Sequence, residues 1–329
     1  MKVAVFSSKP YDEEYLTRAN NGHHELIFHS AAVNPHTVLL AQGCNAICCF
    51  VNDHVDSQTL QQLAALGIKL IVLRCAGFNQ VDLITAKQLG ITVARVPEYS
   101  PHAIAEHALA LILTLNRNIH RAYNRVREND YSLNGLLGFD LANKTVAIIG
   151  TGKIGQVFAH IMKGMGCNII AYDPLPTPAL LTEGICYVTL TELWSQADII
   201  SLHCPLLPET HHIINANVID QMKDGVMLIN TGRGALIDTL AVIAGLKSKK
   251  IGYLGLDVYE EEADLFFEDN SNKLLQDDVF ARLLTFPNVV ITGHQAFFTR
   301  EALTAISNIT ISNIDHFERG ELSEVFCVE

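Results

Sequence analysis

The stretch Gly150-Thr151-Gly152-Lys153-Ile154-Gly155 constrains the fold of this chain more than any other. It follows an apolar run, residues 145–149, that is typical of a buried strand, and it opens residues 154–165, where apolar side chains recur at helical spacing. A G-x-G-x-x-G stretch in that context predicts a dinucleotide site. Gly150 permits the tight turn, Gly152 lets the backbone approach a pyrophosphate, and Gly155 lets the helix pack closely on the strand. The N–H groups at the start of the helix would face the phosphates.

The next apolar run, residues 168–172, ends at Asp173, eighteen residues after Gly155. A carboxylate there accepts hydrogen bonds from both adenosine ribose hydroxyls and repels the 2′-phosphate of NADP. No Arg or Lys stands in the next ten positions to receive that phosphate. The sequence therefore predicts NAD as the cofactor. The alternative, a structural glycine turn followed by a strand-end carboxylate, is disfavoured by the strand context and the spacing.

Composition narrows the class of protein. A chain of 329 residues is long enough for two domains, and a net charge of -12 argues against nucleic acid as a partner. The eight cysteines form no CxxC pair and mostly lie in apolar runs, which predicts a reducing cytoplasm and implies neither zinc nor disulfides. The N-terminal apolar run is too short for a signal peptide, and residues 109–115 are too few to span a bilayer. We therefore expect a cytoplasmic protein that does not enter membranes.

Residues 1 to about 98 alternate short apolar runs with amphipathic segments, which predicts a parallel sheet with helices on its faces. This half has no glycine-rich phosphate turn, so we expect an α/β domain with another task, such as closure over a substrate. The predicted strands are 3–6, 25–28, 46–51, 69–74 and 92–95, and the predicted helices are 11–20, 57–66 and 81–89.

Ser100-Pro101 predicts the start of a long helix, because serine is a good cap and proline suits the first helical position. The helical pattern continues to about Glu128, long enough to bridge two domains or to cover a second subunit. Four arginines lie near the C-terminal end of this helix: Arg117, Arg121, Arg125 and Arg127. They are equally consistent with a solvated helix face and with an oligomer contact.

After the glycine turn the alternation of strands and helices resumes, as in doubly wound dinucleotide-binding domains. The predicted strands are 198–203, 226–231, 253–257 and 289–292, and the predicted helices are 190–196, 216–222 and 239–247. A last helix, 300–317, lies beyond the final strand. We expect it to pack on the first domain, which would make that domain discontinuous.

Three strand ends in this half carry the groups that hydride transfer to a 2-keto acid requires: a cation, a proton donor and a carboxylate. Arg233 follows the strand 226–231, Asp257 ends the next strand and precedes Glu260–Glu262, and His294 ends the last strand. Taken singly, these are often a surface charge, a solvated loop and an ordinary histidine. Together, on the edge where ligands bind open α/β sheets, they favour an active site.

The chain resembles the D-isomer-specific 2-hydroxyacid dehydrogenase family over essentially its whole length, and within it most closely the bacterial fermentative D-lactate dehydrogenases. The resemblance rests on several motifs in combination. They are the glycine turn, Asn230-Thr231-Gly232-Arg233-Gly234-Ala235-Leu236-Ile237-Asp238, Gly255-Leu256-Asp257-Val258-Tyr259-Glu260 with Glu262, Gly293-His294-Gln295-Ala296, Arg74-Cys75-Ala76-Gly77-Phe78-Asn79 with Val81-Asp82, and Val96-Pro97-Glu98-Tyr99-Ser100-Pro101.

The resemblance implies an α/β protein with a Rossmann NAD-binding domain, residues 100–298, inserted in a flavodoxin-like substrate domain, residues 1–99 plus 299–329. The implied reaction is the reversible, NADH-dependent reduction of pyruvate to D-lactate. We expect a homo-oligomer, a dimer or a tetramer, because the long helix after Ser100 needs a surface to cover.

The resemblance also implies residue roles. Arg233 binds the substrate carboxylate and polarises the keto group, His294 is the general acid and base, and Glu262 hydrogen-bonds His294 and tunes it as a proton donor. The implied cofactor contacts are Gly150, Gly152, Lys153, Ile154, Gly155, Asp173, Cys204, Pro205, Thr210, Thr231, Gly232 and Asp257. The implied substrate contacts are Gly77, Phe78, Tyr99, Phe50, Asn52 and Phe297, and no metal is implied.

The chain departs from the family pattern at Gly232, where Ser or Ala is more usual, which adds flexibility beside Arg233. Glu260 and Glu261 flank Glu262, so its assignment rests on the spacing from Asp257. The acidic segment 261–278, with Phe266-Phe267-Glu268-Asp269, resembles an insertion of the lactate branch and has no predicted role beyond loop packing. Two alternatives remain: a dehydrogenase for bulkier 2-keto acids such as phenylpyruvate or ketoisocaproate, and an NAD(H)-sensing regulator without turnover.

Overall fold

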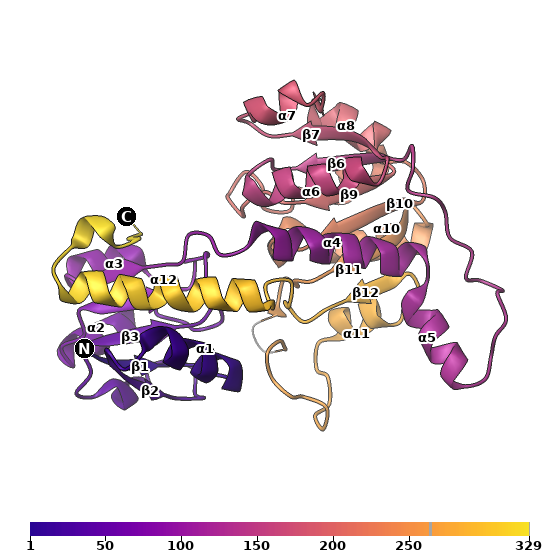
Figure 1. Ribbon diagram of the computed structural model, residues 1–329. Coiled ribbons are helices and arrows are strands. Elements are labelled where there is room, and N and C mark those ends of the chain that lie inside the picture. The colour runs from indigo at the N-terminus through magenta and orange to yellow at the C-terminus, as the bar shows by residue number, and fades with distance from the viewer. Residues whose placement is uncertain (263–264, 329) are drawn as a thin grey trace. The chain divides into compact units, whose positions relative to one another are not determined.

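The computed structural model describes residues 1–262 and 265–328, and these form two compact units (Figure 1). Unit 1 joins Met1–Ser100 to the residues from Phe298 onward, and unit 2 is Pro101–Phe297. Each unit has its own parallel sheet. The predicted α/β class is confirmed. No helix among the described residues is long and apolar enough to cross a membrane.

Unit 1 is built on a five-stranded parallel sheet with the order β2-β1-β3-β4-β5, the order of flavodoxin-like sheets. Its strands are β1 (Lys2–Val5), β2 (Glu25–Phe28), β3 (Ala46–Cys49), β4 (Leu70–Leu73) and β5 (Thr92–Ala94). Its helices are α1 (Pro10–Asn20), η1 (Val38–Ala41), α2 (Ser57–Ala65), α3 (Leu83–Gln88), α12 (Arg300–Glu318) and η4 (Leu322–Glu324). The inner strands β3 and β4 are fully buried because helices cover both faces of the sheet, whereas the edge strand β2 is only partly buried.

Helix α12 completes unit 1 from the far end of the chain. Its Ile311 and Ile314 pack with Val3 and Val72 against one face of the sheet, and the helix lies beside α1. The residues from Phe298 onward therefore lie in the same compact unit as Met1–Ser100.

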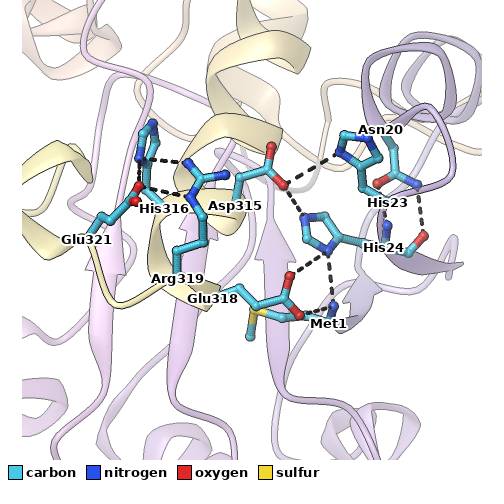
Figure 2. A network of polar contacts seen from close by, with 9 residues as sticks. All are labelled: Met1, Asn20, His23, His24, Asp315, His316, Glu318, Arg319 and Glu321. Carbon is cyan, nitrogen blue, oxygen red and sulfur yellow. Dashed lines mark hydrogen bonds and ion pairs between the residues drawn. The ribbon is translucent and has the colours of Figure 1, made fainter.

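A polar network joins α12 to the N-terminus of unit 1 (Figure 2). The amino group of Met1 donates to Glu318 Oε1 at 2.7 Å. The His24 side chain, only 1% exposed, contacts that amino group through Nδ1 and Asp315 Oδ1 through Nε2, each at 3.0 Å. A buried imidazole with partners on both nitrogens ties strand β1 and helix α12 together.

Unit 2 is built on a seven-stranded parallel sheet with the order β12-β11-β10-β9-β6-β7-β8. Its strands are β6 (Thr145–Ile149), β7 (Asn168–Tyr172), β8 (Cys186–Tyr187), β9 (Ile199–Leu202), β10 (Val226–Asn230), β11 (Ile251–Leu256) and β12 (Val289–Ile291). Its helices are α4 (Pro101–Asn116), α5 (Ile119–Arg127), α6 (Lys153–Gly164), α7 (Pro178–Thr182), α8 (Leu190–Gln196), α9 (Ala216–Gln221), η2 (Gly234–Leu236), α10 (Thr239–Ser248) and α11 (Asp278–Leu284). The strand order reverses between β6 and β9, where open α/β sheets bind ligands.

The predicted single helix from Ser100 to Glu128 is wrong: it is two helices, α4 and α5. Asn118 between them has φ +51°, a left-handed conformation that stops a helix and that Asn adopts more readily than most residues. Helix α5 has no buried residue, and Figure 1 shows it projecting from the body of unit 2. Arg125 donates to the carbonyl of Asn134 at 2.7 Å, so at least this arginine holds the segment that follows.

Candidate active site

The carboxyl ends of the strands of unit 2 carry the predicted site residues. Because all seven strands are parallel, these ends lie on one edge of the sheet. At that edge Gly150 follows β6, Asp173 follows β7, Cys204 follows β9, Thr231 and Arg233 follow β10, Asp257 follows β11, and His294 follows β12.

The three glycines of the turn after β6 have separable roles. Gly150 has φ +93°, and a Cβ there would collide with the backbone of Cys204. A Cβ at Gly155 would collide with the carbonyl oxygen of Gly150. At Gly152, the N-cap of α6, a Cβ would meet nothing within 4 Å. Gly150 and Gly155 therefore serve the packing of unit 2, whereas Gly152 leaves open space at the N-terminus of α6.

Asp173 lies against this glycine turn. Its Oδ2 accepts hydrogen bonds from the Thr151 N–H at 2.7 Å and the Thr151 hydroxyl at 3.2 Å, and its Oδ1 accepts one from the Leu175 N–H at 2.9 Å. The carboxylate thus holds the turn as well as offering acceptor oxygens beside it.

The edge of the sheet fits a dinucleotide. Open space at Gly152 adjoins the N-terminus of α6, where anions are stabilised. Thr231 Oγ1 is buried and has no hydrogen-bond partner among the described residues, a deficit that a polar ligand group would relieve. Ile154 packs on the core of unit 2, so a pyrophosphate contact there would come from its backbone.

Cys204, Pro205 and Thr210 share one turn after β9. The Thr210 hydroxyl donates to the Pro205 carbonyl at 2.6 Å, which fixes the shape of the turn. Burial raises the pKa of the Cys204 thiol to about 11, so this sulfur stays protonated at neutral pH.

His294 and Glu262 form a direct pair. His294 Nδ1 is 2.7 Å from Glu262 Oε1, with side-chain exposures of 15% and 17%. Glu262 Oε2 accepts the Tyr259 N–H at 3.0 Å, so both carboxylate oxygens are engaged. The structure also separates the three consecutive glutamates, because Glu260 contacts His212 and Glu261 is exposed. The contact with His294 belongs to Glu262, the residue that the spacing predicts.

Asp257 holds the loop that carries His294. Its carboxylate is fully buried and accepts the N–H groups of Gln295 at 2.9 Å and Ala296 at 2.8 Å, and its carbonyl accepts the His294 N–H at 2.7 Å. These bonds fix His294 at φ +53°, an unfavourable conformation for this residue type.

The protonation of Asp257 is set by the same surroundings. Burial alone would raise its pKa, but hydrogen bonds from His107, Thr292 and the two loop amides outweigh burial and hold the pKa below its ordinary value. The group is therefore a carboxylate at neutral pH.

Sequence reasoning missed two residues around His294 and its loop, His107 and Phe267. His107 Nε2 lies 2.9 Å from Thr292 Oγ1 and 3.3 Å from Asp257 Oδ1. No sequence signal links His107 on α4 to a loop some 185 positions later. The ring of Phe267 lies 5.5 Å from that of His294, and Phe267 has φ +68°, a rare conformation for an aromatic residue. The only signal for it was a Phe-Phe pair in an otherwise acidic segment.

Arg233 occupies a loop that packs on the loop before Glu262. A Cβ at Gly234 would collide with the backbone of Tyr259, so Gly234 permits this close approach. Neither Gly232 nor Gly234 has a positive φ, so what Gly234 provides is room for this contact and not a left-handed turn. Arg233 Nη1 donates to the Gly232 carbonyl at 2.8 Å and makes no hydrogen bond to Glu262 or His294 among the described residues.

The predicted substrate contacts of unit 1 follow neighbouring parallel strands. Phe50 and Asn52 follow β3, Gly77 and Phe78 follow β4, and Tyr99 follows β5, so they share one edge of that sheet. The Arg74 guanidinium lies 5.0 Å from the centre of the Phe50 ring and fixes that side chain. Phe297, in unit 2, meets the His294 ring edge-on at 6.5 Å.

The acidic segment 261–278 is described except for residues 263 and 264, which lie outside the described residues. Phe266 is buried and packs edge-on against Phe280 of α11 at 5.8 Å. The segment thus has an anchor in the core of unit 2 and brings the next residue, Phe267, to His294.

Comparison with known proteins identifies a family and several similar proteins. Residues 109–296 match the family described as D-isomer specific 2-hydroxyacid dehydrogenase, NAD binding domain. The chain is 53% identical to the D-lactate dehydrogenase of Escherichia coli (strain K12) over 322 residues, 98% of each chain. Its structure resembles one described as the pyruvate reductase of Chlamydomonas reinhardtii, with a TM-score of 0.93, 45% identity and 97% of each chain covered. It also resembles the D-lactate dehydrogenase from Aquifex aeolicus complexed with NAD and lactic acid, with a TM-score of 0.87, 33% identity, and 98% of this chain and 97% of the other covered.

Proposed function

Because the chain belongs to the D-isomer specific 2-hydroxyacid dehydrogenase family, we propose that it reduces pyruvate to D-lactate with NADH, reversibly. The observation that carries this proposal is the 2.7 Å contact between His294 and Glu262 on the edge of the sheet where the glycine turn lies. It joins a proton donor and a carboxylate at a dinucleotide-binding edge. Similarity to a D-lactate dehydrogenase and to a pyruvate reductase supports the choice of substrate.

The cofactor is held by residues of unit 2, the NAD-binding domain. The backbone at Gly152 and the start of α6 receive the pyrophosphate, and Asp173 accepts hydrogen bonds from the adenosine ribose. Thr231 supplies its unpartnered hydroxyl to the nicotinamide half. When bound, NADH supplies the hydride.

Residues of the chain bind the charged substrate and supply the proton. Arg233 binds the substrate carboxylate and polarises the keto group. Glu262 faces Nδ1 of His294, so it orients the ring and leaves Nε2 to give a proton to the developing alkoxide. In the reverse direction the same nitrogen accepts the hydroxyl proton of D-lactate.

Two aromatic rings flank His294 and favour a small substrate. Phe267 and Phe297 lie 5.5 Å and 6.5 Å from the imidazole by ring centroids. Such rings limit the room beside the proton donor, which fits a methyl group better than the side chain of phenylpyruvate. We assign the substrate domain to unit 1, with Gly77, Phe78, Tyr99, Phe50 and Asn52 as further substrate contacts.

Replacing His294 with Gln tests the mechanism. We expect kcat to fall about 100- to 10,000-fold while NADH binds unchanged, because only proton transfer is lost. The control is His160→Gln, a surface histidine paired with Glu183, which should keep full activity. Unchanged turnover in the His294 variant would remove this residue from the mechanism.

A kcat/KM panel over pyruvate, ketoisocaproate and phenylpyruvate tests the substrate. We expect pyruvate to be preferred. If a larger keto acid is preferred, the proposed function becomes the reduction of that acid, and D-lactate formation is no longer the main reaction. No NADH oxidation with any of them would favour an NAD(H)-sensing regulator.

We also propose that the chain acts as a cytoplasmic homo-oligomer, a dimer or a tetramer. On α5, Ile119, Tyr123 and Val126 are 55%, 60% and 53% exposed and follow helical spacing, so they form an apolar stripe. Leu133 and Leu137 beyond the helix are 82% and 89% exposed. A second copy would cover this surface. Light scattering after size exclusion should give a multiple of 36.2 kDa; a monomer would refute the proposal.

A further inference from the structure

Unit 2 contains a second cluster of polar side chains, separate from the His294–Glu262 pair. His211, His212 and Glu260 each offer one ligand atom, and these three atoms lie within 4.8 Å of one another. His212 Nε2 is 2.7 Å from Glu260 Oε1, and the two imidazole rings stack with centroids 3.9 Å apart. The proposed reaction uses none of the three.

The backbone holds the two histidines on one side. Adjacent residues of an extended chain point in opposite directions. His212 instead has φ +50°, a left-handed conformation that is uncommon in residues other than glycine. Its N–H donates to the Ala235 carbonyl at 2.9 Å, and its carbonyl accepts Asn215 Nδ2 at 2.9 Å. The fold therefore imposes this turn from two sides.

Glu260 is oriented toward the histidines. Its second oxygen, Oε2, accepts a hydrogen bond from the Thr239 hydroxyl at 3.2 Å, which points Oε1 at His212. The side chains of His212 and Glu260 are 32% and 25% exposed, and His211 is exposed. The cluster is thus preorganised on its inner side and open to solvent on its outer side.

We propose that His211, His212 and Glu260 form a Zn²⁺-binding site. Two imidazole nitrogens and one carboxylate oxygen are a ligand set that Zn²⁺ takes in sites with one open position, which water fills. The ion would enter between His212 and Glu260 in place of their hydrogen bond. It would link the turn that holds Thr210 to the turn that holds Glu262.

Calorimetric titration of the untagged protein with ZnCl₂ tests the site. Thiols are good zinc ligands, and Cys186 and Cys327 are exposed, so both are replaced by Ser throughout. We expect one equivalent of Zn²⁺ to bind and to raise the Tm, and EDTA to reverse both effects. His211→Ala should lose that equivalent without loss of folding, because its side chain lies at the surface.

Two further variants sharpen the result. Glu260→Gln keeps a hydrogen-bonding side chain but removes the anionic ligand, so it should weaken Zn²⁺ binding at least tenfold. His160→Ala is the matched control, because His160 and Glu183 form a surface pair at 2.9 Å that no second histidine joins among the described residues. Its zinc stoichiometry should stay unchanged. Equal stoichiometry in the parent and the His211→Ala protein would overturn the proposal, whatever the outcome for pyruvate reduction.

Discussion

Glu262 contacts His294 across 32 positions of sequence, with 2.7 Å between Oε1 and the imidazole Nδ1. The pair is largely shielded from water, and the Tyr259 N–H holds the other carboxylate oxygen. One side of the imidazole is therefore committed to Glu262. The opposite nitrogen is the one that can exchange a proton with a substrate.

This pairing predicts how two substitutions combine. Glu262→Gln should lower kcat about tenfold to a hundredfold, because a neutral amide holds the ring but stabilises its cation poorly. In the double variant with His294→Gln, the loss should equal that of His294→Gln alone, since Glu262 acts through the histidine. Steady-state kcat values of the parent, the two single variants and the double variant give the coupling energy between Glu262 and His294. If the two losses of kcat multiply in the double variant, Glu262 acts independently of His294.

The glycine turn predicts a contrast between two neighbouring substitutions. Gly155→Ala should destabilise unit 2 by several kcal/mol, roughly the cost of overpacking, because the new Cβ meets the Gly150 carbonyl. Gly152→Ala meets nothing, so stability should be kept while the Kd for NADH rises about tenfold or more. The single tryptophan, Trp194, lies in the core of unit 2 and reports its urea unfolding by fluorescence. Tight NADH binding by Gly152→Ala would place the pyrophosphate elsewhere.

Asp257 predicts a specific dependence of stability on pH. Its pKa in the folded state is depressed, so the carboxylate stabilises the fold above the unfolded value of about 3.9. That contribution is lost as the pH falls through the folded pKa. Asp257→Asn should therefore cost roughly 2 kcal/mol or more at pH 7, with a smaller difference from the parent below about pH 4. Urea unfolding at pH 7, 5 and 3.5 measures this. A difference that does not change with pH would mean that the charge is unimportant.

Phe267 predicts the size limit of the substrate. Phe267→Ala removes a ring beside His294 and should raise kcat/KM for phenylpyruvate relative to pyruvate about tenfold. Phe266→Ala is the matched control, since Phe266 packs against Phe280 in the core and should affect stability but not selectivity. The same selectivity change in both variants would indicate a general loosening of the segment.

The network in Figure 2 predicts a local stability effect. His24→Ala leaves the Met1 amino group and Asp315 without a buried partner and should cost about 1–3 kcal/mol. His23→Ala is the control: its side chain is 63% exposed and 3.9 Å from Asp315, so it should be nearly neutral. Denaturant midpoints compare the two variants. Equal midpoints would show that the network adds little to stability.

Periodicity predicted most of the fold, because strands buried on both faces leave unbroken apolar runs. The strand Glu25–Phe28 and the helix Leu190–Gln196 match their predicted bounds. The break at Asn118 was not predicted, because polar and apolar residues recur at helical spacing on both sides of it. The short elements α7, β8 and α11 were missed because two to seven residues carry too little periodic signal.

Strand-end logic correctly placed Asp173, Arg233, Asp257 and His294 on one edge of the sheet, because parallel strands bring their carboxyl ends together whatever the loops contain. It did not find His107 or Phe267. These approach His294 and its loop through tertiary packing of a helix and a long connection, which no local pattern encodes. Nor did it reveal that Gly234 serves close packing, since spacing alone does not separate a turn from a contact.

The return of α12 to unit 1 has a consequence for biosynthesis. Ile311 and Ile314 cover a face of the sheet whose first strand, Lys2–Val5, leaves the ribosome more than 300 residues earlier. Unit 2 is continuous and is synthesised entirely within that interval. The part of this apolar face that α12 covers therefore stays open while unit 2 folds, although α1 already covers the rest through Leu16. The nascent chain is exposed to chaperones and to aggregation until α12 emerges.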